Sequence, residues 1–110
     1  MPLEPVRSTT VVGRRMRSRR EALGWSQEKV GVLIGIDESS SRARISRYEL
    51  GVHEPAVATA RLIAVALQVS LPYLYCEDDD VADLLLALND LSKAVRREKA
   101  RLFAQMLGSS

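Results

Sequence analysis

The 110-residue chain is poor in several residue types, and each shortage excludes a class of function. It has one cysteine, Cys76, and one histidine, His53, so it can form no internal disulfide and offers no thiolate and imidazole cluster for a metal. Neither residue has partners at catalytic spacing. We therefore assign Cys76 to packing and His53 to an exposed loop, and we expect no cofactor and no enzymatic activity.

Long hydrophobic runs are also lacking. No apolar stretch reaches the roughly 20 residues that span a bilayer, and the first ten residues, MPLEPVRSTT, lack the apolar core of a secretion signal. We therefore expect a cytoplasmic protein with no membrane partner. No small-molecule ligand is evident from the sequence.

Aromatic residues make up only 5% of the chain, whereas Ala, Leu, Val and Arg abound, which favours an all-α fold. The length fits one domain. Residues 1–76 carry 11 Lys and Arg against 7 Asp and Glu, whereas residues 77–110 carry 5 against 7. The basic first part indicates a phosphate-facing surface, although arginines on a solvated helix face would give the same balance.

Apolar spacing and capping residues predict a series of short helices. The first covers residues 10–23 and ends at Gly24, and Ser26 caps a second helix that ends at Gly35. A third helix has Ile45 inward and a wide polar outer face, and it ends at Gly51. A fourth helix follows Pro55, and a fifth is formed by LPYLY.

Three segments, RMRSRREALGWSQEKVGVLIGI, ISRYELGVHEP and LIAVALQVSL, taken in this order, resemble the Cro and phage-repressor family of helix-turn-helix proteins, also called the xenobiotic-response-element type. The resemblance covers roughly residues 12–75. It implies a five-helix, lambda-repressor-like DNA-binding domain over residues 10–76, after a flexible arm of residues 1–9. Residues 77–110 then form an acidic linker and an additional long C-terminal amphipathic helix.

The resemblance also implies roles for individual residues. Arg20 and Glu49 should form a buried ion pair between the first and third helices. Gln27 should contact the DNA backbone, and Arg42, Ala43, Ser46 and Arg47 fall on the positions that read bases. Beyond the resemblance, we also assign Arg44, Ser39, Ser40 and Arg15 to the DNA backbone. The alternative is that Arg42 pairs with Glu38 and that Arg44 and Arg47 only face water.

One stretch departs from the family pattern. Nine residues separate Gly35 from Ile45, where the family usually has five. Four extra residues are close to one helical turn, so they could extend the third helix, with Asp37 as its cap, without rotating its outer face. Alternatively the serines form a loop and Ser40 or Ser41 caps a shorter helix. We favour the extended helix.

The C-terminal segment has apolar residues spaced by four and three, typical of a helix that packs along one seam. These candidate dimerisation residues are Leu84, Leu88, Leu91, Val95 and Leu102. A single helix over residues 80–107 would span roughly 40 Å. Instead of pairing with a second copy, this helix could fold back along its own domain.

Taken together, the resemblance and the apolar seam lead us to expect a sequence-specific, repressor-like regulator that binds double-stranded DNA as a homodimer. The alternative is a protein-interaction module, such as an antitoxin or adaptor, whose C-terminal helix binds a partner protein.

Overall fold

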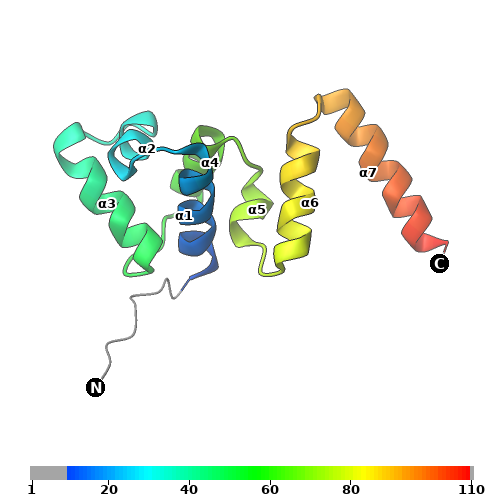
Figure 1. Ribbon diagram of the computed structural model, residues 1–110, viewed down its shortest axis with the longest axis horizontal. Coiled ribbons are helices and arrows are strands. Elements are labelled where there is room, and N and C mark those ends of the chain that lie inside the picture. The colour runs from blue at the N-terminus through cyan, green and yellow to red at the C-terminus, as the bar shows by residue number, and fades with distance from the viewer. Residues whose placement is uncertain (1–9, 110) are drawn as a thin grey trace, which may run out of the picture.

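The computed structural model describes residues 10–109, and this range contains seven α-helices and no strand (Figure 1). The helices are α1 (Val11–Leu23), α2 (Gln27–Leu33), α3 (Glu38–Leu50), α4 (Val57–Leu67), α5 (Leu71–Tyr75), α6 (Asp79–Asn89) and α7 (Lys93–Gly108). The all-α prediction is confirmed. The predicted arm of residues 1–9 lies outside the described residues.

Local chemistry sets the ends of the first two helices. The Thr10 hydroxyl accepts a hydrogen bond of 3.1 Å from the Gly13 amide at the start of α1. Gly24 ends α1 with φ at 72°, a conformation that glycine adopts without steric cost. The Ser26 hydroxyl accepts a bond of 3.0 Å from the Lys29 amide and caps α2. The turn between α1 and α2 thus needs only three residues.

The α2 and α3 helices pack unusually closely. A Cβ atom on Gly31 would lie 2.4 Å from the Ser41 Cβ, so only glycine fits at this crossing. The Ser41 side chain is fully buried, and its hydroxyl donates to the carbonyl oxygens of Ile36 and Asp37 at 3.1 and 3.0 Å. The extended third helix is confirmed because α3 begins at Glu38. Asp37 occupies the cap position, but the predicted capping by its side chain is not formed: the carboxylate makes no capping bond to a backbone amide and accepts a bond from the Ser39 hydroxyl.

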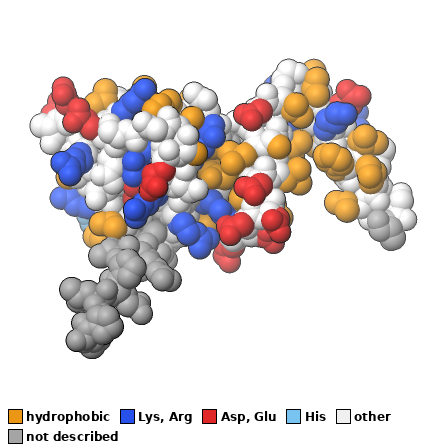
Figure 2. All heavy atoms as spheres, viewed as in Figure 1, with side chains coloured by type: hydrophobic (Ala, Val, Ile, Leu, Met, Phe, Trp, Pro, Cys, Tyr) orange, Lys and Arg blue, Asp and Glu red, His pale blue; other side chains and the backbone are white. Residues whose placement is uncertain are grey.

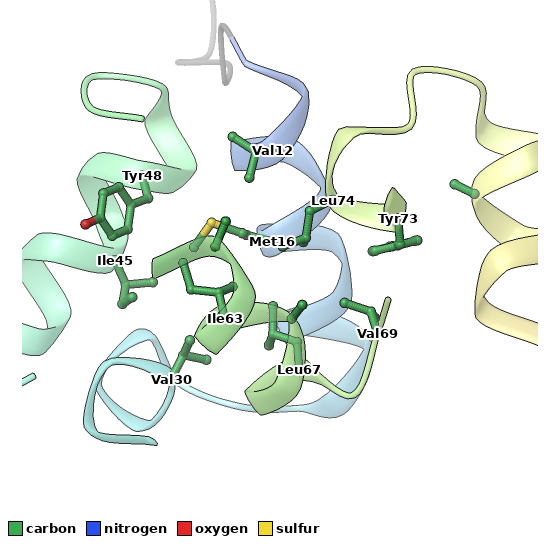
Figure 3. Packing of buried hydrophobic residues seen from close by; sticks show 13 residues of the cluster. Val12, Met16, Val30, Ile45, Tyr48, Ile63, Leu67, Val69, Tyr73 and Leu74 are labelled. Atoms are coloured by element: carbon green, nitrogen blue, oxygen red, sulfur yellow. The ribbon is translucent and has the colours of Figure 1, made fainter. Parts of the chain in front are cut away.

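The hydrophobic core draws on every helix except α7 (Figure 3). Its largest fully buried side chains are Met16 of α1, Ile45 of α3, Ile63 and Leu67 of α4, and Leu74 of α5. In α6, Ala82 is buried in the same core, and Leu85 and Leu86 pack against it. The predicted boundary at residue 76 therefore does not separate two cores, because α6 packs on the preceding domain.

The prediction of one long C-terminal helix is wrong. The predicted apolar seam is shared between two helices, since α6 ends at Asn89 and α7 starts at Lys93. The Ser92 hydroxyl caps α7 by accepting a hydrogen bond of 3.3 Å from the Val95 amide. Arg96 holds the corner: it donates to the carbonyl oxygens of Leu88, Asn89 and Leu91 at 3.0, 3.3 and 3.0 Å. No residue of α7 is buried, so the helix projects from the domain and does not fold back (Figure 1).

Among the described residues, no helix is long and apolar enough to cross a membrane.

Candidate nucleic-acid interface

The outer face of α3 is the candidate interface. The inward face of α3 carries the buried residues Ser41, Ile45, Tyr48 and Glu49. The residues on the other side are exposed, except for the half-buried Ser46; they are Ser39, Ser40, Arg42, Ala43, Arg44, Ser46 and Arg47. The structure thus gathers seven of the nine residues predicted to touch DNA on one helix face.

Two open hollows flank α3 and leave it as a ridge. One lies between α3 and the first two helices and is lined by Arg17, Gln27, Arg42 and Ser46 among others. The other lies between α3, the preceding turn and α4, and its lining includes Ala43, Arg44, Arg47, Thr59 and Leu62. A ridge of this kind is what the major groove of DNA admits, because the groove is wide enough for one helix.

A polar network fixes this ridge to the domain. The buried Glu49 carboxylate, 3% exposed, accepts two hydrogen bonds from Arg20, at 2.7 and 3.0 Å, and one of 3.1 Å from the Gln27 amide group. Arg20 also donates to the Trp25 carbonyl oxygen at 2.9 Å. The hydrogen bonds that Arg20 donates to Glu49 raise the pKa of Arg20. The predicted ion pair is therefore present between α1 and α3, and the hydrogen bond from Gln27 attaches α2 to it.

The three arginines of the outer face form no salt bridge with a described residue. None of Arg42, Arg44 and Arg47 belongs to an ion pair among residues 10–109, where the pairs are Arg15–Asp79, Arg17–Glu21 and Arg20–Glu49. The alternative pairing of Arg42 with Glu38 is not formed. These guanidinium groups are thus available to phosphates or to base edges.

The prediction that Arg15 contacts the DNA backbone is wrong. Arg15 is only 7% exposed, and it donates to the Cys76 carbonyl oxygen at 2.9 Å and pairs with Asp79 at 2.9 Å. Its guanidinium carbon also lies 5.8 Å from the centre of the Tyr73 ring. Arg15 follows Val12 by three residues, so it lies on the buried side of α1 beside Met16. Its role is to attach α1 to α5 and α6.

Arg19, on α1, binds the end of α4. Its Nε donates to the Leu67 carbonyl oxygen at 2.9 Å, at the end of α4. A cation at a helix C-terminus is favoured by the helix dipole. Arg19 therefore caps the C-terminal end of α4 from α1.

Sequence reasoning assigned no role to Arg17, which lines the same hollow as Arg42 and Ser46. Its exposed side chain bonds Glu21 at 2.7 Å. The sequence signal for Arg17 is its position three residues before Arg20, because residues three apart share a helix face and Arg20 faces α3. The Cys76 thiol donates a hydrogen bond to the Asp78 carbonyl oxygen, and the His53 side chain is exposed. The described residues contain no group of three or more His, Cys, Asp or Glu that could hold a metal ion.

Two closely packed helices joined by a glycine turn, with an exposed basic face on the second, define the helix-turn-helix class of DNA-binding domain. A family model described as Helix-turn-helix (HTH_3) matches residues 16–74, which is more than half of the chain. The chain belongs to this family of Cro and repressor-type helix-turn-helix proteins. It is therefore a DNA-binding regulator of transcription and not an enzyme.

A solved structure shows the same architecture over a longer range. The chain is similar to the transcriptional regulator BswR, with 37% sequence identity and a TM-score of 0.77, over 88% of this chain and 96% of that one. A match over 88% of 110 residues cannot be supplied by residues 1–76 alone, so it includes part of the C-terminal helices. A search of the curated proteins finds no match.

Proposed function

We propose that this chain is a sequence-specific, repressor-like regulator that binds double-stranded DNA as a homodimer with α3 in the major groove. One observation carries the proposal: the exposed face of α3 presents Arg42, Arg44 and Arg47, which form no ion pair with any of residues 10–109, on a ridge between two hollows. Phosphates and guanine edges are the natural partners of such arginines.

The positions along α3 suggest a division of labour. Arg42 and Arg47 lie where they can grip the N7 and O6 atoms of guanine with two hydrogen bonds each, and Ser46 lies between them. Ala43 offers a methyl group for contact with thymine. Arg44, Ser39 and Ser40 are assigned to the DNA backbone, together with Gln27 at the positive end of α2.

The homodimer follows from what one module can and cannot do. A single helix reads few base pairs, whereas a two-fold dimer doubles the site and reads half-sites about 34 Å apart or a multiple of that distance. A dimer lying across a promoter would exclude polymerase, which is the basis of the repressor-like assignment. A reporter gene behind the selected site should lose expression when the protein is present, and gain of expression would overturn that assignment.

Selection of bound sequences from random DNA tests the readout. The wild-type chain should enrich a palindrome, and Arg47→Ala should lose the preference for one base in each half-site. Arg44→Ala is the matched control, because it should weaken all sites alike and lower the slope of affinity against salt by about one. If Arg47→Ala weakened binding equally at all DNA sequences, Arg47 would contact the DNA backbone and not a base. An affinity unchanged between low and high salt would contradict phosphate binding altogether.

A further inference from the structure

The α7 helix shows an apolar stripe that its own chain leaves uncovered. Val95, Leu102 and Phe103 are 38%, 46% and 40% exposed, and no residue of this helix is buried. At 100° per residue these three side chains lie within one broad stripe, with Lys99 inside it. Arg97 and Arg101 lie on the opposite side.

The α6 helix carries a second stripe of the same kind. Its inner side, with Ala82, packs on the core, whereas Val81 and Leu84 are 47% and 46% exposed. Leu88 and Leu91 continue this stripe half-buried towards the corner. Asp80 and Asp83 border the stripe on one side. Figure 2 shows hydrophobic side chains on both helices, and acidic side chains along α6 that gather mainly at its end away from the corner.

The charges of the two stripes decide how they can pair. As a whole, α7 has five Lys and Arg against one acid, whereas α6 has three Asp and no base. Within the α7 stripe the base is Lys99, and the one acid, Glu98, lies at the edge of the stripe beside Leu102. Pairing α7 with α7 of another copy would bring Lys99 towards its own equivalent, and pairing α6 with α6 would bring together Asp80, Asp83 and their equivalents. Like charges facing each other across an interface are costly, whereas opposite charges select the partner and fix the register.

We propose that the occupant is a second copy of this chain, and that the dimer forms by exchange: α7 of each copy packs on α6 of the other. The inference rests on the proposed homodimer and deepens it by naming the two faces that meet. Two exchanged contacts form per dimer, since a two-fold axis repeats each one. Both faces belong to the segment from Asp79 to Gly108.

Two full-length variants separate the possible pairings. The first carries Val81→Asp and Leu84→Asp and so disables the α6 face; the second carries Val95→Asp and Leu102→Asp and disables the α7 face. Each should be monomeric alone by light scattering, because each exchange contact has lost one side. Mixed in equal amounts they should form a heterodimer, since one contact in that pair is intact.

Other outcomes would overturn the exchange. If the α6 variant stays dimeric alone, α7 pairs with α7; if the α7 variant stays dimeric alone, α6 pairs with α6. If the wild-type chain is itself a monomer, or if the mixture gives no heterodimer while both variants retain wild-type circular dichroism, no exchange occurs. Lys99→Glu adds a charge test: it should weaken the dimer, whereas Arg97→Glu, on the far side of α7, should weaken it less.

Anisotropy of a labelled duplex with a single half-site, measured on the same preparations, keeps the two proposals apart. The reading helix α3 lies on another part of the molecule, so binding of a half-site reports on α3 alone. Half-site binding by a protein that does not exchange would refute the pairing but not the DNA-binding function. Absence of half-site binding in the wild-type chain would refute the function whatever the oligomeric state.

Discussion

At the scale of single residues, the contact between Gly31 and Ser41 decides how closely α2 and α3 approach. Gly31→Ala would place a methyl group 2.4 Å from the Ser41 Cβ and 2.8 Å from its Cα. We expect the free energy of unfolding to fall by about 1 to 3 kcal/mol, because overpacking forces the two helices apart. Urea denaturation measures this loss.

Gly108→Ala is the matched control for that substitution, since a Cβ at Gly108 meets nothing within 4 Å and the residue is also helical. It should cause no loss of stability. Adding Ser41→Gly to Gly31→Ala should restore part of the stability only, because the short distance to the Ser41 Cα remains. Unchanged stability in Gly31→Ala would show that the helices do not cross at this distance.

The carboxylate of Glu49 is a second residue on which the motif depends. Glu49→Ala leaves the Arg20 guanidinium, whose side chain is 14% exposed, without its partner, and removes the acceptor of the Gln27 amide. Losing one partner of a buried pair costs about 3 to 5 kcal/mol. Thermal unfolding of the variant should show this loss directly.

The control is Glu21→Ala, which breaks the exposed pair with Arg17. Exposed pairs contribute little to stability, because water and salt screen them. The pair with Arg17 lowers the pKa of Glu21, so its contribution is present above the usual carboxylate pKa and is lost as the pH falls. Equal losses in Glu49→Ala and Glu21→Ala would contradict the structural role of the buried pair.

The sequence predicted single residues best where local chemistry decides. Ser26 and Gly24 were found because caps and left-handed turns follow from residue type alone. The partnership of Arg20 with Glu49 came only from the family resemblance, because no local rule joins residues 29 positions apart. Arg15 was wrongly assigned to the DNA backbone because it belongs to the basic first part of the chain, although its spacing from Val12 indicated the buried side.

At the scale of elements, the corner between α6 and α7 is the feature that the apolar spacing concealed. Leucines spaced by four and three continue across residues 90–92, so the pattern predicts one helix where there are two. Asn89, Asp90 and Ser92 are the local signals of a break, because short polar side chains compete with helical hydrogen bonds and cap new helices. The three bonds from Arg96 involve carbonyl oxygens, which leave no trace in the sequence.

Arg96→Ala should loosen this corner without unfolding the domain. We expect a loss of about 1 to 2 kcal/mol of local stability, and so roughly 5- to 30-fold faster amide exchange at the start of α7. Exchange in the first five helices should not change. Arg97→Ala is the control, and equally fast exchange in both variants would show that Arg96 does not hold the corner.

At the scale of the whole molecule, Tyr73 lies where α1, α5 and α6 meet. Burial raises the pKa of its hydroxyl, against the opposing effect of the nearby Arg15 charge. Above about pH 10 the unfolded chain ionises this tyrosine while the folded chain keeps it neutral, so the folded state loses stability as the pH rises further. Tyr73→Phe removes this contribution.

Unfolding curves measured at successive pH values from about 8 to 11 test the effect. The wild-type free energy of unfolding should fall more steeply above about pH 10 than that of Tyr73→Phe. Parallel curves for the two proteins would show that the hydroxyl does not ionise differently in the folded and unfolded chains.

The hydrogen bonds that Arg96 donates at the end of α6 also affect DNA binding, although Arg96 lies far from the reading helix α3. A fixed corner means that α7 loses little freedom when it meets a partner, which favours association. In the proposed dimer the same corner, together with the attachment of α6 by Arg15, sets how far apart the two reading helices stand. The side chain of Arg96, at the start of α7, would then decide whether the protein tolerates one more or one fewer base pair between half-sites.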